Sequence, residues 1–268
     1  MIINIMNNIS DIKHAFYINL ASRPDRKQHV EEQLKKISVN AQRFNAIKLP
    51  NGALGCSLSH LKCLETAKKN NWSHLLIVED DIKFLDPDLF KKQFNTFLTN
   101  HSKWDVVIIG GNNVPPYQKI DDTCVKVSSC QTTTGYLVNG HYFDTLIDNF
   151  RTGIKKLMEN PQSHILYAID KYWFNLQKRD NWFLIIPLTV TQREDYSDIE
   201  KRATNYANVM TDLDKEWFFK KQPSPHQILQ NSASNKMSQL SITSEPIKSN
   251  IKLNTETKKP SIKVTMNI

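Results

Sequence analysis

The feature that most constrains this chain is an apolar run, residues 75–78, that ends directly in three carboxylates, Glu79, Asp80 and Asp81. The run predicts a buried strand, and ligands of open α/β sheets bind outside the carboxyl ends of strands. Residues two apart in a strand face the same side, so we expect Glu79 and Asp81 to converge while Asp80 faces elsewhere. Crowded carboxylates favour Mg²⁺ or Mn²⁺, which would bind phosphate groups of a ligand. The alternative is an acidic loop without metal that caps the helix after Pro87.

The rest of the N-terminal half alternates short apolar runs with amphipathic ones. We expect strands over residues 15–20 and 106–109, and helices over residues 24–37, 57–69 and after Pro87. Strands that alternate with helices predict an α/β sandwich with a mostly parallel central sheet.

Beyond residue 112 the pattern is less regular. Pro187 cannot donate a hydrogen bond to a sheet, so we expect an edge or terminal position for a strand that contains it. Ser197 and Glu200 have the spacing of a capping box, which predicts a helix running toward Phe219. In chain order, we expect a strand over 132–138, helices over 142–157 and 168–178, and a strand over 183–190.

The composition divides the chain into a globular domain, residues 1–220, and a C-terminal segment, residues 221–268. The segment has no Gly, Trp, Tyr, Phe or Cys and buries too little apolar surface to fold, so we predict a disordered basic tail. Much of the formal net charge of +8 lies there. A solvated tail is the simplest interpretation, and peripheral association with an anionic membrane face is the alternative. Charge alone also suggests a nucleic-acid-binding protein, but the globular part has no basic stripe interleaved with aromatic residues.

The N-terminal residues 1–13 lack the charged start, apolar region and cleavage site of a signal peptide. No apolar run approaches the roughly 18 residues that span a bilayer, so we expect a cytoplasmic protein. The four cysteines, Cys56, Cys63, Cys124 and Cys130, have no C-x-x-C spacing and should be core thiols. A disulfide between Cys124 and Cys130 in an oxidising compartment is the alternative.

Three further segments accompany the acidic triplet. They are Tyr17–Leu20 with Arg23, Asp25 and Arg26; Gly55–His60, which reads GCSLSH; and Thr133–Leu137, followed by Asp170 and by residues 192–199. With residues 76–81, these segments resemble the motifs of glycosyltransferase family 25, the family of lipooligosaccharide and procollagen galactosyltransferases. The resemblance covers about residues 14–200, and its most specific parts are the GCSLSH and acidic segments.

The resemblance implies a GT-A fold, a UDP-sugar donor, a divalent metal (Mn²⁺ or Mg²⁺) and inversion at the anomeric carbon of the sugar. Arginine side chains bind phosphate in a bidentate manner, which suits Arg23 and Arg26 to a diphosphate. Ser59 and His60 would otherwise be ordinary packing or capping residues of a helix. The roles implied are metal binding for Glu79 and Asp81, and donor binding for Asn19, Arg23, Arg26, Gly55, Ser59, His60 and Asp80.

Inverting transfer requires a general base for the acceptor hydroxyl, and Asp170, near a predicted helix start, is the candidate. The alternative is a plain helix N-cap. Asp144, Asp148 and Asp195 lie in the same half of the chain and are the other candidates for the base. Many GT-A enzymes add a late histidine to the metal site, but residues 183–220 contain none. His141, His164 or water would have to replace it.

The resemblance therefore implies a galactosyltransferase-like enzyme of glycan or lipopolysaccharide biosynthesis. Galactose is the sugar that the family resemblance favours, with glucose next. A glycan, a lipid-linked saccharide or a hydroxylysine would accept it. The main alternative is an inactive relative that binds the nucleotide sugar without turnover.

Overall fold

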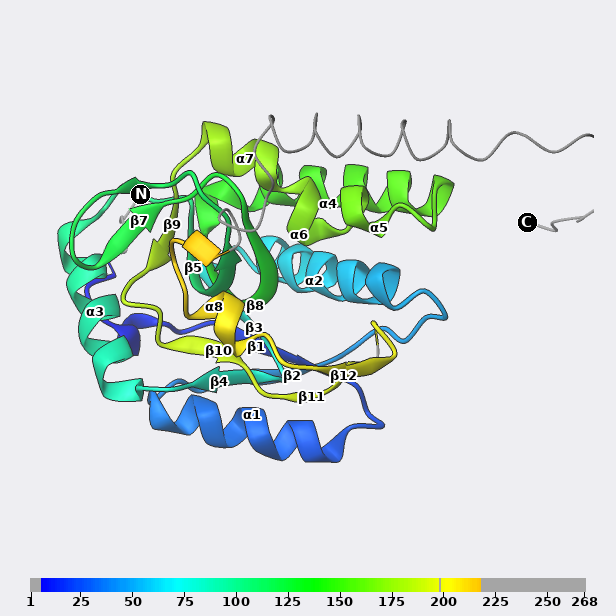
Figure 1. Ribbon diagram of the computed structural model, residues 1–268, viewed down its shortest axis with the longest axis horizontal. Coiled ribbons are helices and arrows are strands. Elements are labelled where there is room, and N and C mark those ends of the chain that lie inside the picture. The colour runs from blue at the N-terminus through cyan, green and yellow to red at the C-terminus, as the bar shows by residue number, and fades with distance from the viewer. Residues whose placement is uncertain (1–5, 198, 218–268) are drawn as a thin grey trace, which may run out of the picture. The chain divides into compact units, whose positions relative to one another are not determined.

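The computed structural model describes residues 6–197 and 199–217 of the chain (Figure 1). The described residues up to Glu216 form one compact unit. The predicted tail, residues 221–268, lies outside the described residues. None of the helices in the described ranges is long and apolar enough to cross a bilayer.

The centre of the unit is an eight-stranded sheet with the order β2-β1-β3-β8-β5-β9-β7-β6. The pairs β1–β2, β1–β3 and β5–β9 are parallel, and those that involve β8 or β7 are antiparallel. Strands β8 and β7 therefore run against the other six, which confirms the predicted mostly parallel α/β sheet. The strands are β1 Ala15–Asn19, β2 Gln42–Asn45, β3 His74–Glu79, β5 Val106–Asn113, β6 Gln118–Lys119, β7 Cys124–Lys126, β8 Cys130–Asn139 and β9 Trp182–Ile185.

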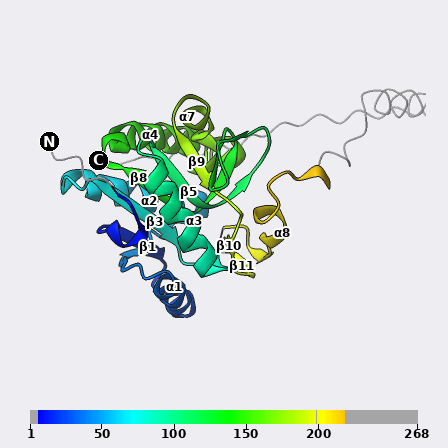
Figure 2. The same ribbon diagram turned by 90° about the vertical axis from the view of Figure 1, so that its left-hand side faces the viewer.

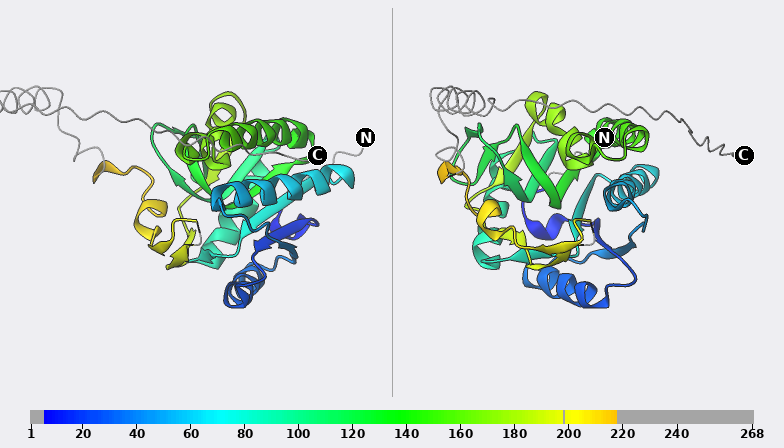
Figure 3. Two further views of the ribbon diagram at one scale, coloured as in Figure 1. Left: turned by 90° about the vertical axis from the view of Figure 1, so that its right-hand side faces the viewer. Right: turned by 45° about the vertical axis from the view of Figure 1, so that its right-hand side comes forward.

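Helices cover both faces of this sheet. The four long helices are α1 Pro24–Lys36, α2 Gly52–Lys69, α3 Pro87–Asn100 and α4 Phe143–Glu159. Figure 3 shows α2 and α4 side by side, and Figure 2 looks onto α3. The short elements are η1 Ile9–Asp11, η2 Gly140–Tyr142, α5 His164–Tyr167, α6 Ile169–Tyr172, α7 Phe174–Arg179 and α8 Ala207–Met210.

The apolar run of β3 explains why both faces are covered. Leu75 and Ile77 belong to a core cluster with residues of α2 and α4, whereas Leu76 and Val78 belong to a second cluster with residues of α1 and α3. Successive side chains of a strand point to opposite faces, so a strand that is apolar throughout requires a layer on each side. This arrangement leaves only the strand ends for ligands.

The loops before two helices supply their start signals. Asn51 accepts a hydrogen bond from the Leu54 N–H at 3.1 Å, so α2 begins at Gly52 rather than at the predicted residue 57. Asp86 in the same way caps α3, which begins at Pro87 as predicted.

Three expectations for the C-terminal half were wrong. The predicted strand 183–190 is two strands, because β9 ends at Ile185 and β10 Val190–Gln192 pairs with β4 Ile82–Phe84. Strand β9 lies between β5 and β7 rather than at an edge, and Pro187 lies in the connection after it. The predicted helix 168–178 is divided into α6 and α7.

The predicted helix after Ser197 is instead a hairpin of β11 Asp195–Ser197 and β12 Arg202–Thr204. The Ser197 hydroxyl does accept a hydrogen bond from the Glu200 N–H at 3.1 Å, but the bond closes a turn. The same local bond serves turns as well as helix starts, which is why the pattern was misleading. All four cysteines are free in the structure, so Cys124 and Cys130 are not paired.

Candidate active site

A buried arginine joins the carboxyl ends of the central strands to the C-terminal hairpin. Helix α1 follows β1 directly, which places Arg26 beside the turn that follows β3. Arg26 Nη1 lies 3.1 Å from Asp80 Oδ1 and 3.3 Å from Asp81 Oδ2. Its Nε lies 3.0 Å from Asp195 Oδ2, and its Nη2 donates to the Tyr196 carbonyl oxygen at 3.1 Å. One guanidinium group therefore holds three carboxylates together.

Asn19 and Arg23, the other residues predicted to bind the nucleotide, belong to the same network. Asn19 Nδ2 donates to Asp80 Oδ2 at 2.7 Å, and Arg43 Nε donates to Asn19 Oδ1 at 3.0 Å. Arg23 Nη2 lies 2.6 Å from Asp195 Oδ2 and also pairs with Asp25. Burial would raise the pKa of Asp195, but the Tyr196 N–H and the two arginines hold it at about 2.

The turn after β3 explains one wrong expectation. Strand β3 ends at Glu79, so the alternation of side chains does not extend through Asp80 and Asp81. Both aspartates face the Arg26 guanidinium, and Asp80 does not point elsewhere. Burial raises the pKa of Asp80, and Arg26 and Asn19 limit the rise.

The carboxylate of Asp81 is only partly hydrogen-bonded. Its Oδ1 is buried and has no hydrogen-bond partner among the described residues. Burial and the charge of Glu79 raise its pKa to about 8, although Arg26 acts in the other direction. A buried polar atom without a partner is costly, and a divalent cation would supply the missing partner. The oxygen donors of Asp81 therefore suit Mg²⁺ or Mn²⁺.

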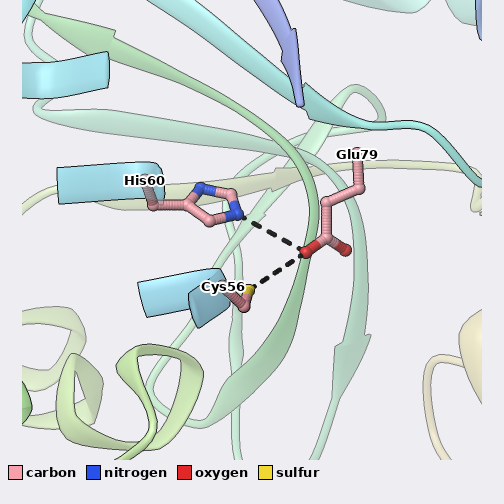
Figure 4. A group of neighbouring side chains, drawn as sticks. All are labelled: Cys56, His60 and Glu79. Atoms are coloured by element: carbon pink, nitrogen blue, oxygen red, sulfur yellow. Dashed lines mark hydrogen bonds and ion pairs between the residues drawn. The ribbon is translucent and has the colours of Figure 1, made fainter. Parts of the chain in front are cut away.

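Glu79 lies in a different environment, surrounded by donors (Figure 4). Its Oε1 accepts from Thr133 Oγ1 at 2.8 Å and lies 3.4 Å from His60 Nε2 and 3.5 Å from Cys56 Sγ. Gln192 Nε2 lies 3.5 Å from Oε2. Burial alone would raise the pKa of Glu79, but His60, Thr133 and Cys56 lower it below its ordinary value. The site thus contains an anionic Glu79 beside a more easily protonated Asp81.

Cys56, His60 and Glu79 form a second possible metal-ligand group. One ligand atom from each lies within 4.8 Å of the others, and α2 supplies two of the three. The ring of His60 is fully buried and its Nδ1 lies 2.8 Å from the Tyr136 hydroxyl. A proton on Nε2, donated to Glu79, satisfies both ring nitrogens, so these three side chains form a hydrogen-bond network that needs no metal.

Gly55 and Ser59 lie behind this network, where they pack α2 against the segment after β2. The Ser59 hydroxyl donates to the Gly55 carbonyl and accepts from the Ile47 N–H, each at 2.8 Å. A Cβ on Gly55 would lie 2.5 Å from the Ile47 carbonyl oxygen. Both residues therefore position the helix that contains Cys56 and His60, and glycine is required by close approach.

A bulge in β8 brings Asp170 to the same region. Residues 132–134 lie opposite the single residue Gly111 of β5, and Thr132 has φ of 72°. A β-branched residue in this left-handed region is strained, and bulges next to active sites redirect side chains. The Thr132 N–H donates to Asp170 Oδ2 at 3.1 Å, while the next residue, Thr133, donates to Glu79.

Asp170 is not the N-cap that the alternative interpretation required. Ala168 occupies that position, and Asp170 lies in the first turn of α6 without a capping hydrogen bond. Burial raises its pKa, and the charge of Glu79 adds to the rise. A half-buried carboxylate with a raised pKa is a suitable general base.

The other candidates from the sequence lie elsewhere. His141 pairs with Asp105, just before β5 and thus away from the carboxyl end of β3, and His164 is exposed on α5. His60 is instead the histidine beside Glu79. Asp144 pairs with Lys68, and Asp148 is exposed on α4 near Arg151. Asp195, which belongs to the Arg26 network, has a low pKa and three arginine partners and is a weak base.

Sequence reasoning assigned no role to several residues of the site. Thr133 and Gln192 fell within matched segments, but nothing in their spacing pointed to Glu79. Cys56 was expected only as a core thiol; it lies four residues before His60, already predicted to bind the donor, and this spacing on one helix was a usable signal for a shared face. Arg193, whose N–H donates to the Asp81 carbonyl oxygen at 2.8 Å, had no local signal.

Comparison with known proteins gives the same family as the motifs. Residues 48–173 match the model of Glycosyltransferase family 25 (LPS biosynthesis protein), which confirms the resemblance over that range. Mouse (Mus musculus) Inactive glycosyltransferase 25 family member 3 is 22% identical over 190 residues, covering 59% of this chain and 30% of the relative. The Procollagen lysyl hydroxylase and glycosyltransferase of Acanthamoeba polyphaga mimivirus is 24% identical over 217 residues, covering 59% and 24%. The chain thus spans less than a third of these two curated relatives.

A solved structure adds a distant likeness. The glycosyltransferase involved in the glycosylation of the major capsid of PBCV-1 aligns with a TM-score of 0.40 and 10% identity. The alignment covers 74% of this chain and 88% of that one.

The Arg26 network generates a stability prediction. Arg26→Met should lower the free energy of unfolding by about 3–5 kcal/mol, because it leaves buried carboxylates uncompensated. Lys27→Met is the matched control: the next residue of α1 has only an exposed pair with Glu31 at 3.7 Å, and the loss should stay below about 0.5 kcal/mol. Denaturant unfolding of both variants measures the difference. Equal small losses would contradict the role given to Arg26.

Proposed function

We propose that this chain, which matches the model of glycosyltransferase family 25 over residues 48–173, transfers a sugar from a UDP-sugar to an acceptor hydroxyl in a metal-dependent, inverting reaction. The observation that supports this most directly is Asp81 Oδ1 at the carboxyl end of β3, a buried atom with no hydrogen-bond partner in residues 6–197 and 199–217. That edge of an α/β sheet is where nucleotide ligands bind.

Asp81 would hold Mn²⁺ or Mg²⁺, with Glu79 beside it. When bound, the cation would neutralise charge on the diphosphate of the donor and on the departing UDP. Glu79 already has hydrogen bonds from Thr133 and His60, so Asp81 is the primary ligand in this proposal. Arg26 fixes the orientation of Asp80 and Asp81 and prevents the acidic turn from opening.

Asp170 would act as the general base. The oxygen of the acceptor hydroxyl attacks the anomeric carbon from the side opposite to UDP, and the bond between that carbon and the phosphate oxygen breaks. The hydroxyl proton passes to Asp170, whose pKa is raised by burial. The Thr132 N–H fixes one carboxylate oxygen, Oδ2, and leaves Oδ1 to accept the proton.

The sugar and the acceptor are finer parts of the proposal. We infer galactose from UDP-galactose, because the motifs resemble those of galactosyltransferases. A glycan or lipid-linked saccharide fits a family described as LPS biosynthesis proteins, and a hydroxylysine fits the procollagen relative. A panel of acceptors assayed with UDP-galactose distinguishes these classes.

An inactive nucleotide-sugar-binding protein is the second candidate. The name of the mouse relative, which describes that protein as inactive, is the observation that favours it. Such a protein would bind UDP with Mn²⁺ yet release no UDP from a UDP-sugar. Slow manganese-dependent hydrolysis without an acceptor would favour the enzyme instead.

The role of Asp81 predicts the behaviour of a nearly isosteric variant. Asp81→Asn should greatly weaken UDP binding in Mn²⁺, because the amide is a poorer ligand for a hard cation. Its stability should not fall, since a buried carboxyl with a raised pKa is already costly when charged. Calorimetric titration with UDP, with and without EDTA, measures the effect. UDP affinity that is unchanged by the substitution and by EDTA would exclude the metal role.

The role of Asp170 predicts a separate defect. Asp170→Asn should reduce kcat by about 10²–10⁴-fold while UDP affinity and Tm remain near those of the wild type. Asparagine can still accept the Thr132 hydrogen bond but not the proton. Asp148→Asn, on the exposed face of α4, is the control and should keep full turnover. Normal turnover of the Asp170 variant would reject the base, and loss of UDP binding would move Asp170 into the donor site.

A further inference from the structure

Another cluster of ligand-type side chains, separate from the candidate active site, lies between the end of α3 and the start of β7. His101 follows α3, Cys124 begins β7, and Asp121 lies in the loop before it. His101 Nε2 lies 2.7 Å from Asp121 Oδ2 and 3.9 Å from Cys124 Sγ. The three ligand atoms all lie within 4.8 Å of one another. We propose that His101, Asp121 and Cys124 bind a thiophilic divalent cation, Zn²⁺ in the first place.

The orientation of the imidazole distinguishes this cluster from a nucleophilic triad. In a Cys-His-Asp relay, the thiol and the carboxylate contact different ring nitrogens, so that one proton passes between them. Here Asp121 and Cys124 both approach Nε2. Three donors that converge on one point form the geometry of a coordination site rather than of a relay.

Neighbouring groups already orient two of the ligands. The ring of His101 lies against Phe97 and Phe183, with ring centroids 4.9 and 6.1 Å away. Asp121 Oδ1 accepts from the N–H and hydroxyl of Thr123 at 2.7 and 2.6 Å and from the Cys124 N–H at 3.2 Å. These bonds leave Oδ2 toward the cluster, and such outer contacts are typical of metal ligands.

The cluster is open on one side. The side chains of His101 and Asp121 are 21% and 35% exposed, whereas Cys124 is fully buried. The thiol is therefore the buried ligand of the site, and the other two ligands lie next to solvent. Solvent would supply the fourth ligand of a tetrahedral Zn²⁺ site.

The donor set also selects the metal. Thiolate and imidazole favour Zn²⁺, whereas the oxygen ligands around Asp81 favour Mg²⁺ or Mn²⁺. On binding, the Cys124 thiol releases its proton to solvent and the sulfur donates an electron pair to the cation. The Nε2 atom of His101 also donates its lone pair to the cation, and the imidazole proton is then on Nδ1. The bound cation would link α3 to strand β7.

Cobalt binding to the full chain, after treatment with a chelator, tests the site. Co²⁺ occupies zinc sites, and its coordination by thiolate gives a near-ultraviolet charge-transfer band. We expect one equivalent of Co²⁺ to produce this band, and Zn²⁺ to abolish it and to raise the Tm. Cys124→Ser should eliminate the band, whereas Cys56→Ser, the matched control beside Glu79, should retain it. Asp121→Asn keeps an acceptor for Thr123 but should bind Co²⁺ more weakly.

Two results would overturn the proposal. One is a wild-type chain that gives no charge-transfer band with Co²⁺, in which case His101 and Asp121 form only a hydrogen bond over a buried thiol. The other is a band that persists in Cys124→Ser and disappears in Cys56→Ser. If Cys124→Ser does not fold, His101→Gln replaces it, since it retains the thiol and should still lose tight Co²⁺ binding. These readouts do not depend on transferase activity.

Discussion

The buried guanidinium group of Arg26 connects the acidic turn of the candidate donor site to the C-terminal hairpin. It contacts the turn after β3 through Asp80 and Asp81 and the β11–β12 hairpin through Asp195 and Tyr196. Removing charges from water is costly, and it is compensated here by charge-assisted hydrogen bonds in several directions. Within the described part of the chain, the network still leaves Asp81 Oδ1 without a partner. The network thus positions the acidic turn and leaves one oxygen for the cation that we propose.

The β8 bulge positions the acceptor side of the proposed site. A regular strand could not direct the Thr132 N–H to Asp170 and the Thr133 hydroxyl to Glu79 at consecutive positions. The left-handed φ of Thr132 costs about 1–3 kcal/mol, which the surrounding sheet must offset. Local strain of this kind is expected where two carboxylates with different roles are placed close together. In our account Glu79 belongs to the metal side and Asp170 to the acceptor side.

Much of the N-terminal half could be predicted from local patterns. The apolar residues 75–78 predicted β3, and the acids after it marked the ligand edge, because both signals lie within a few residues of each other. The predicted orientation of Asp80 was wrong because the strand ends at Glu79. Only a distant residue, Arg26, determines how the turn folds. The hairpin after Asp195 was missed for the same reason. Long-range ion pairs fix it, and the local capping pattern at Ser197 does not reveal them.

We infer that Asp81 Oδ1, which has no hydrogen-bond partner among the described residues, is a metal ligand beneath the donor diphosphate. The most direct measurement is a crystal structure with Mn²⁺ and UDP, with anomalous diffraction recorded at the manganese absorption edge. The account predicts one strong anomalous peak within coordination distance of Asp81 Oδ1 and next to the UDP phosphates. A peak between Cys56, His60 and Glu79, or UDP bound with no peak near Asp81, would contradict it.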